Sequence, residues 1–212
     1  MKLKNKVALI TGAGNGFGKA IAILFASEGA EVIVADIDIE AAILVAKEIC
    51  SDNGKATPLF VDVASNTHFR KLVDEIITLY SRIDIVVNNA GTTHKNQPML
   101  DVNEEEFQRV FDVNVKSIYL SAKHVLPVFK RQKRGVMVNI GSTAGIRPRP
   151  GLVWYNATKG AVITMTKSMA IELAPENSRV VAVNPVIGET NLLPKFLPGN
   201  DNAEIRKKMI ET

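Results

Sequence analysis

The chain has 212 residues, of which 46% are hydrophobic and 23% charged, so it is long enough for one sizeable core and is read as one domain over residues 1–212. Its first apolar run stops at Thr11, too soon for a signal peptide, and no later run reaches the roughly 18 residues of a membrane span. The net charge of +4 would suit an anionic partner. However, the densest basic run, 130–134, closes a helical pattern and has no aromatic platform beside it. These features argue against a membrane protein and against a nucleic-acid-binding protein.

The cysteine and histidine content points to a reducing compartment and to no metal site. Cys50 is the single cysteine, so the chain can form no internal disulfide, and we expect a cytoplasmic protein. The three histidines, His68, His94 and His124, are scattered without ligand spacing.

Short runs rich in Val and Ile alternate along the chain with longer amphipathic segments. Strands are predicted over residues 6–11, 31–36, 55–62, 83–89, 135–141 and 179–185. Helices are predicted near residues 17–28, 39–51, 66–81, 104–131 and 153–174. Several strands are apolar on both faces, which is typical of a parallel sheet covered on each side. The pattern therefore predicts a doubly wound, Rossmann-like α/β fold, whose ligands bind outside the carboxyl ends of the strands.

The first strand runs directly into the stretch TGAGNGFG, with glycines at 12, 16 and 18, and then into a helix. Glycine permits a tight turn there, and the first amides of the helix can face phosphate oxygens. Asp36 ends the next strand, where a carboxylate accepts hydrogen bonds from a ribose and repels a 2′-phosphate. The alternative is that Asp36 caps the helix near Ile39, although Asp38 is better placed to do so. This arrangement predicts NAD(H) as the cofactor, in preference to NADP(H).

Tyr155 and Lys159 lie four residues apart and should share one helix face. A lysine ammonium nearby lowers the pKa of a tyrosine, and a second positive charge, such as an oxidised nicotinamide ring, would bring it closer to neutrality. The alternative is a pair on a solvated helix face. Ser142 follows a predicted strand, where it caps the next turn or faces a ligand. Asn114 is a poor helix former inside a predicted helix and indicates an irregularity there.

The stretch TGAGNGFG, the run NNAG at 88–91, Asn114, Ser142 and the Tyr155/Lys159 pair together resemble the short-chain dehydrogenase/reductase family over essentially the whole chain. The resemblance implies that Ser142 orients the substrate oxygen, that Tyr155 transfers the proton and that Lys159 also binds the nicotinamide ribose. It implies a water-linked proton relay from Asn114 to Lys159. The cofactor contacts that we expect are Gly12, Asn15, Gly16, Phe17, Gly18, Asp36, Asp62, Val63, Asn89, Ala90, Gly91, Tyr155, Lys159, Pro185 and Thr190.

Further expectations concern residues at or just after the ends of predicted strands. Asn88, at the end of the fourth strand, is expected on the adenosine side of the cofactor with Ala90 and Gly91. Asp62 and Val63 resemble adenine contacts of the family, or they simply terminate a strand. Val186 stands where the family usually has a glycine, which leaves the local backbone path uncertain.

The sequence thus predicts an NAD(H)-dependent oxidoreductase that interconverts a secondary alcohol and a ketone or aldehyde. The alternative is a non-catalytic nucleotide-binding or regulatory protein of the same fold. Residues 190–212 should begin the substrate-binding region. Since the family usually continues into a further helix and a seventh strand, we expect a C-terminally truncated piece whose last strand is a bare edge. We also expect a homo-dimer or homo-tetramer assembled through the helices at 104–131 and 153–174, with reduced stability and weak activity.

Overall fold

The computed structural model describes residues 1–199 and contains one parallel six-stranded sheet in the order β3-β2-β1-β4-β5-β6. The strands are β1 (Val7–Thr11), β2 (Glu31–Asp36), β3 (Lys55–Phe60), β4 (Ile85–Asn88), β5 (Gly135–Ile140) and β6 (Ser178–Val183). The predicted fold class is confirmed, the bounds of β2 are those predicted, and no other strand end differs from its predicted position by more than two residues. Because β3 ends at Phe60, Asp62 and Val63 lie in the turn after the strand.

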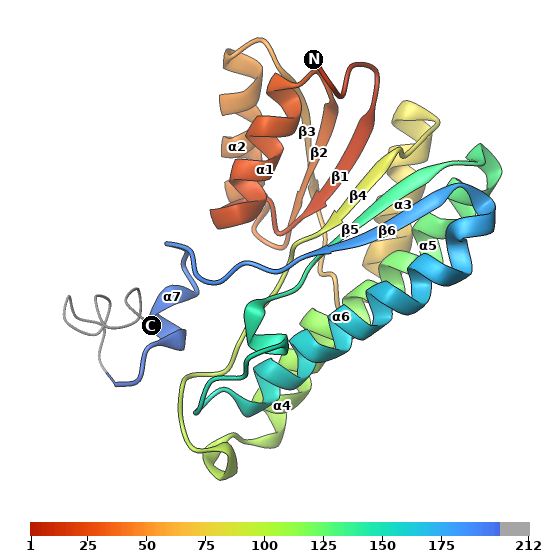
Figure 1. Cartoon of the computed structure of the whole chain (residues 1–212). Helices are drawn as coiled ribbons and strands as arrows, with labels where there is room; N and C mark the ends of the chain where they lie inside the picture. Colours follow the sequence, from red (N-terminus) through yellow and green to blue (C-terminus); the bar gives the residue numbers. More distant parts are fainter. Residues whose placement is uncertain (200–212) are drawn as a thin grey trace.

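Helices cover both faces of this sheet (Figure 1). α1 (Gly16–Ser27) and α2 (Ile39–Ser51) pack on one face through small residues such as Ala22, Ala26 and Ala42. α3 (Asn66–Tyr80), α5 (Ser117–Gln132) and the C-terminal part of α6 (Val153–Leu173) pack on the other. The shorter elements are η1 (Met99–Asp101), α4 (Glu104–Phe111), η2 (Asp112–Lys116), η3 (Thr143–Gly145), η4 (Ala174–Glu176) and α7 (Leu193–Phe196).

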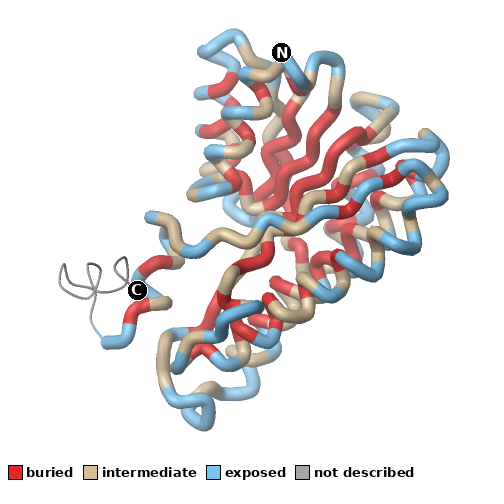
Figure 2. The backbone as a smooth tube through the Cα atoms, in the orientation of Figure 1, coloured by how far each residue is buried: buried red, intermediate tan, exposed pale blue. Residues whose placement is uncertain are grey.

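The central strands supply the core. Every residue of β1 and β4 is buried, as is all of β2 except its first residue, and Figure 2 shows these strands as the buried centre of the molecule. Both faces of these strands are apolar because helices cover both sides. In β6, by contrast, buried and exposed residues alternate at first, and Val181 and Val183 are exposed.

The helix predicted over 104–131 is not continuous, because a π-helical turn at Asp112–Lys116 separates α4 from α5. Asn114 lies in this turn and is 2% exposed. Its Oδ1 accepts a hydrogen bond of 2.8 Å from the Thr92 amide, and its Nδ2 donates to the Thr92 carbonyl at 2.9 Å and to the Thr158 hydroxyl at 3.0 Å. Two of these bonds satisfy the backbone groups of Thr92, in a loop 22 residues away, and the third joins Asn114 to α6, so all three stabilise the irregular backbone. The expected irregularity is confirmed, and the Asn114 side chain makes its three hydrogen bonds with Thr92 and Thr158.

The chain changes direction across β1, since β2 and β3 extend the sheet on one side of it and β4, β5 and β6 on the other. The carboxyl ends of β1 and β4 therefore border a crevice, which is where a doubly wound sheet binds its ligands. Within residues 1–199, no helix is long and apolar enough to cross a membrane.

Candidate active site

A cavity of about 1030 Å³ lies at the carboxyl ends of the strands. Most of the residues predicted for the site line it: Gly12, Asn15, Gly16, Phe17, Asp36, Asp62, Val63, Asn89, Ala90, Gly91, Ser142, Tyr155, Lys159, Pro185 and Thr190. Gly18 and Asn114 do not line it. Both lie behind the wall of the cavity, where they hold the lining residues in place.

The glycine-rich turn between β1 and α1 requires glycine at its closest contacts. Gly12 and Gly16 have φ values of +63° and +54°, which residues with a side chain rarely adopt. A Cβ atom on Gly18 would lie 2.1 Å from the Gly12 carbonyl oxygen. Gly18 is therefore needed for helix packing and is not a lining residue. The Asn15 side chain makes no capping hydrogen bond to α1, so the first amides of this helix remain available to an anion.

Asp36 is buried at the end of β2, and its carboxylate braces the same turn. Its Oδ2 accepts a hydrogen bond of 2.7 Å from the Gly14 amide, and its Oδ1 accepts one of 3.0 Å from the Asp38 amide. Asp38 caps α2 by accepting from the Ala41 amide at 3.0 Å. The prediction that Asp38 rather than Asp36 is the cap is confirmed. Each carboxylate oxygen of Asp36 has further acceptor capacity on the cavity side.

Asn89 fastens the glycine turn to the end of β4. Its Nδ2 donates to the carbonyl oxygens of Thr11 and Gly12, both at 2.9 Å. In return, the Thr11 hydroxyl oxygen accepts from the Asn89 and Ala90 amides, both at 3.2 Å. Four hydrogen bonds thus fix the two sides of the crevice relative to one another.

Asn88 is not part of the cavity wall, so its expected place beside the cofactor is wrong. Its side chain points into the sheet, where Nδ2 donates to Asn139 Oδ1 at 2.8 Å. Asn139 Nδ2 donates in turn to the Thr166 hydroxyl at 2.9 Å. All three side chains are buried, and each amide finds a partner, as buried polar groups must. Asn88 therefore links β4 through β5 to α6.

Tyr155 and Lys159 both face the cavity from the first turns of α6. The Lys159 Nζ lies 5.8 Å from the centroid of the Tyr155 ring and donates a 2.8 Å hydrogen bond to the carbonyl oxygen of Ile140, the last residue of β5. Burial lowers the pKa of Lys159 to about 8, because water no longer stabilises its charge. The ammonium form is still the major one at neutral pH.

Ser142 follows β5 and lines the cavity beside Tyr155. Its Oγ accepts a 3.1 Å hydrogen bond from the Ala144 amide, which orients the hydroxyl. Burial raises the pKa of Tyr155, whereas a hydrogen bond with Ser142 and the charge of Arg149 act in the opposite direction. In the chain without ligand the pKa of Tyr155 is therefore raised, since the loss of hydration at the phenol outweighs the nearby charge. The lowered pKa expected from Lys159 and an oxidised nicotinamide ring together stays a prediction.

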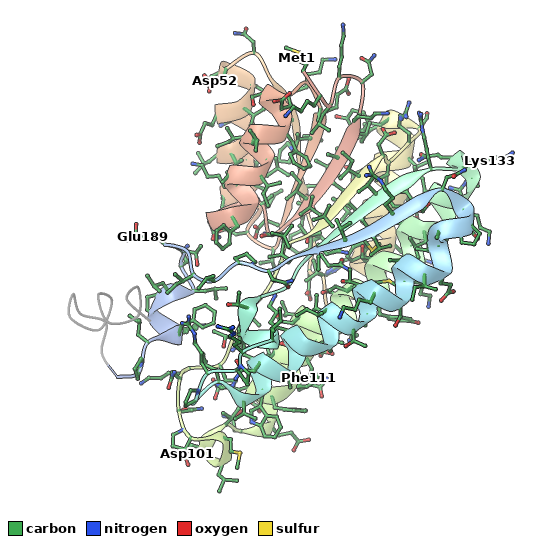
Figure 3. The ribbon with its side chains drawn as sticks, in the orientation of Figure 1. Met1, Asp52, Asp101, Phe111, Lys133 and Glu189 are labelled. Carbon is green, nitrogen blue, oxygen red and sulfur yellow. The ribbon has the colours of Figure 1, made fainter. Side chains whose placement is uncertain are left out.

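An apolar wall faces the reacting groups. The ring of Phe196 in α7 stands edge-on to the Tyr155 ring, with centroids 5.1 Å apart, and packs with Ala144 and Leu152. α7 is the described part of the region 190–212, and residues 200–212 lie outside the described residues. The chain reaches α7 from β6 through an outer bend at Glu189, labelled in Figure 3. Val186 in this segment has no left-handed backbone conformation, so a valine fits where glycine is usual.

The sequence pattern did not identify Arg149 or Leu152 as residues of this cavity, and it included Phe196 only as part of the expected substrate-binding region 190–212. Arg149 lies in the irregular segment before α6, so helix periodicity does not place it. The position of the Phe196 ring depends on the path of the segment that precedes α7. In the part of the chain that the structure describes, no three His, Cys, Asp or Glu side chains are placed to hold a metal ion.

Comparison with known proteins agrees with this geometry. The family model for short chain dehydrogenases matches residues 6–200. A 4-formylbenzenesulfonate dehydrogenase of Comamonas testosteroni is 45% identical over 210 residues, 99% of this chain and 83% of that protein. Two solved structures are also similar. One is a 3-ketoacyl-(acyl-carrier-protein) reductase from Brucella melitensis complexed with NADH, with 45% identity, 91% of this chain and 80% of that chain covered, and a TM-score of 0.88. The other is a metagenomic short-chain oxidoreductase in complex with NADP, with 31% identity, 87% and 84% covered, and a TM-score of 0.84.

Proposed function

Because the chain belongs to the short-chain dehydrogenase/reductase family, we propose that it is an NAD(H)-dependent oxidoreductase that interconverts a secondary alcohol and a ketone or aldehyde. The observation that carries the proposal is the meeting of Ser142, Tyr155 and Lys159 at one wall of a cavity that also contains the glycine turn and Asp36. A protein that only binds a nucleotide needs the turn and the carboxylate, but not the three polar groups at the far wall.

The residues of the crevice fit a dinucleotide. The left-handed glycines and the uncapped start of α1 leave space and amide donors for a pyrophosphate, and Asp36 supplies acceptors for a ribose. When bound, a nicotinamide cofactor supplies the acceptor or donor of a hydride. Asp62 beside the crevice is held by the Ala64 amide at 2.9 Å and, with Val63, would border the adenine.

The chain's own groups would move the proton. In the direction of reduction, Ser142 donates a hydrogen bond to the carbonyl oxygen, and Tyr155 gives its phenolic proton to that oxygen. The charge of Lys159 stabilises the phenolate that remains. Phe196 and Leu152 keep water from the reacting atoms. In the direction of oxidation the phenolate takes the hydroxyl proton, and the same groups act in reverse.

Replacing Tyr155 with Phe tests the mechanism. Y155F keeps the ring that packs on Phe196 and removes only the hydroxyl, so we expect kcat to fall by at least about a thousandfold while NADH still binds. Turnover is measured with NADH and a panel of ketones and aldehydes, and binding by the change in NADH fluorescence. If Y155F keeps most of the activity, Tyr155 is not the proton carrier. If NADH binds to the wild-type chain but no carbonyl compound is reduced, the chain is a nucleotide-binding protein.

The preference for NAD(H) is a separate prediction. The similar structures contain NADH in one case and NADP in the other, so the fold alone leaves the choice open. Asp36 supports NAD(H), because the 2′-phosphate of NADP would meet a buried carboxylate that already accepts two amide bonds. We expect kcat/KM to be at least about a hundredfold higher with NADH than with NADPH. Equal values with the two cofactors would refute this assignment.

The expected homo-dimer or homo-tetramer, the cytoplasmic location, the effect of the C-terminal segment on activity and the water relay from Asn114 stay predictions.

A further inference from the structure

Among the residues that the structure describes, Arg149 is a cation whose guanidinium has no partner, and it lies at the wall of the active-site cavity. Its side chain is half-buried and lines the cavity together with Leu152, Tyr155 and Phe196. Within residues 1–199 its guanidinium makes neither a hydrogen bond nor a salt bridge, and only its backbone carbonyl is engaged, accepting from Asn156 Nδ2 at 2.8 Å. A guanidinium held against apolar side chains loses part of its hydration, and an anion is the group that best compensates for that loss.

Other charged side chains of the cavity wall have partners or are exposed to solvent. Lys159 donates to the Ile140 carbonyl. Arg109 donates to the Thr92 hydroxyl at 2.6 Å and to the Thr93 carbonyl at 3.2 Å, so it holds a loop. Asp112 pairs with Lys116 at 3.4 Å. Glu104 and Glu105 are exposed in the first turn of α4. The charge of Arg149 acts at the Tyr155 phenol, where it opposes the rise in pKa that burial causes.

The backbone near Arg149 adds to the positive potential. α6 begins at Val153, and a helix of 21 residues has a partial positive charge at its N-terminus. The loop that carries Arg149 is itself fixed, because the Gln97 amide donates to the Gly151 carbonyl at 3.1 Å and Asn156 holds Arg149 from the other side. The backbone that carries the guanidinium is therefore held in place, which helps a side chain to bind one defined part of a ligand.

We propose that Arg149 binds an anionic group of the substrate, so that the enzyme selects alcohols and carbonyl compounds that carry a carboxylate, sulfonate or similar anion over neutral ones. The apolar side chains Leu152 and Phe196 contact the body of the substrate between that anion and the reacting carbon. This proposal rests on the proposed function for the site as a whole, but not on the choice between NAD(H) and NADP(H).

The test compares two aldehydes that differ in charge and little in shape, 4-formylbenzoate and 4-formylbenzamide, each reduced with NADH. For the wild-type chain we expect kcat/KM to favour the carboxylate. In R149Q we expect the ratio of the two values to fall at least about tenfold, and in R149K to fall less, since the charge remains but the paired donors do not. Arg149 also influences the Tyr155 pKa, but this influence changes the reduction of both aldehydes equally and cancels in the ratio.

A matched control is R147Q, two residues away, because Arg147 is exposed and does not line the cavity. Its ratio should equal that of the wild type.

A binding experiment separates this proposal from the proposed function. Calorimetric titration of 4-(hydroxymethyl)benzoate and 4-(hydroxymethyl)benzamide, in the presence of NADH, requires no turnover. Tighter binding of the carboxylate to the wild type, lost in R149Q and kept in R147Q, supports the role of Arg149 even if neither aldehyde is reduced. Equal binding of the two alcohols to the wild type, or an unchanged preference in R149Q, overturns it. NADH fluorescence shows whether each variant is folded.

Discussion

Lys159 places a positive charge in a site that is nearly closed to water. Its side chain is 6% exposed, and its one hydrogen-bond partner among the described residues is the Ile140 carbonyl. Burial lowers the pKa of Lys159 from the ordinary value of 10.5 to about 8. The charged form of Lys159 is therefore less stable in the folded chain than in the unfolded one, and this difference lowers the free energy of unfolding at neutral pH.

This shift predicts how stability changes with pH. Below pH 8 Lys159 is charged in both states, and its burial cost is fully present. As the pH rises from about 8 to 10.5, the folded chain loses the proton first and the cost disappears. K159M has no such titration, so we expect the free energy of unfolding of the wild type, relative to K159M, to rise by about 2 kcal/mol between pH 7 and pH 9.5.

Urea denaturation of both proteins at the two pH values measures this difference. K167M is the control, because Lys167 is exposed on the same helix, and its difference from the wild type should not change with pH. A difference between K159M and the wild type that is the same at both pH values would contradict the lowered pKa of Lys159.

The sequence could reveal those site residues whose positions depend only on neighbouring residues in the same helix or strand. Tyr155 and Lys159 share a helix face because they are four residues apart, and Asp36 ends a strand that follows a recognisable glycine turn. Those positions follow from helix and strand periodicity alone. Arg149 lies in an irregular segment, and Phe196 lies in a short helix whose position depends on the irregular segment before it. The pKa of Tyr155 depends on how much water its neighbours exclude. Local spacing in the sequence predicts none of these three features.

At the scale of single elements, α6 and the short η3 helix touch through glycines that differ sharply in their tolerance. A Cβ on Gly145 in η3 would lie 2.6 Å from the backbone carbon of Lys159, whereas a Cβ on Gly160 in α6 meets only the Gly145 carbonyl oxygen, at 3.7 Å. Gly145 is therefore a packing requirement. Gly160 is a helix-interior glycine with space for a methyl group.

Two alanine variants should change stability in opposite directions. We expect G160A to raise the free energy of unfolding by about 0.5–1 kcal/mol, because alanine loses less backbone entropy in a helix. G145A should lower it by more than about 2 kcal/mol, since the clash is with backbone and pushes Lys159 from its place. Denaturant unfolding measures both, and each variant serves as the control for the other. Loss of stability in G160A would show that this part of α6 is more crowded than the contacts indicate.

The break between α4 and α5 is the element that sequence reasoning located least well. Asn114 signalled an irregularity, but a helical pattern runs through 104–131 without interruption in its apolar residues. The π-helical turn exists because Asn114 satisfies both backbone groups of Thr92, a loop residue 22 positions away. Periodicity within a segment carries no information about such a distant partner.

At the scale of the whole molecule, β6 forms one edge of the described sheet and exposes apolar side chains. Val181 is 44% exposed and Val183 50% exposed, and β6 pairs with β5 alone. An edge strand with apolar side chains favours association between chains, and an added charge opposes it. We expect V181K to reduce concentration-dependent light scattering of the 212-residue chain. L44K adds the same charge on the exposed surface of α2, and it should have a smaller effect. If both variants reduce scattering equally, net charge rather than the edge is responsible.

The strand order also determines when the sheet can be completed as the chain leaves the ribosome. β1 pairs with β2 through Val7 and Glu31, but its other neighbour is β4, through Ala8 and Ile85. Closing the second loop, about three times as long, costs roughly 1 kcal/mol more in chain entropy. β1, the first strand to be synthesised, thus waits for more than a third of the chain before both of its edges are satisfied. β1, β2 and β3 can already form a sheet before β4 is synthesised, but the β4 side of the cofactor crevice is then still missing. The binding site therefore forms late in folding.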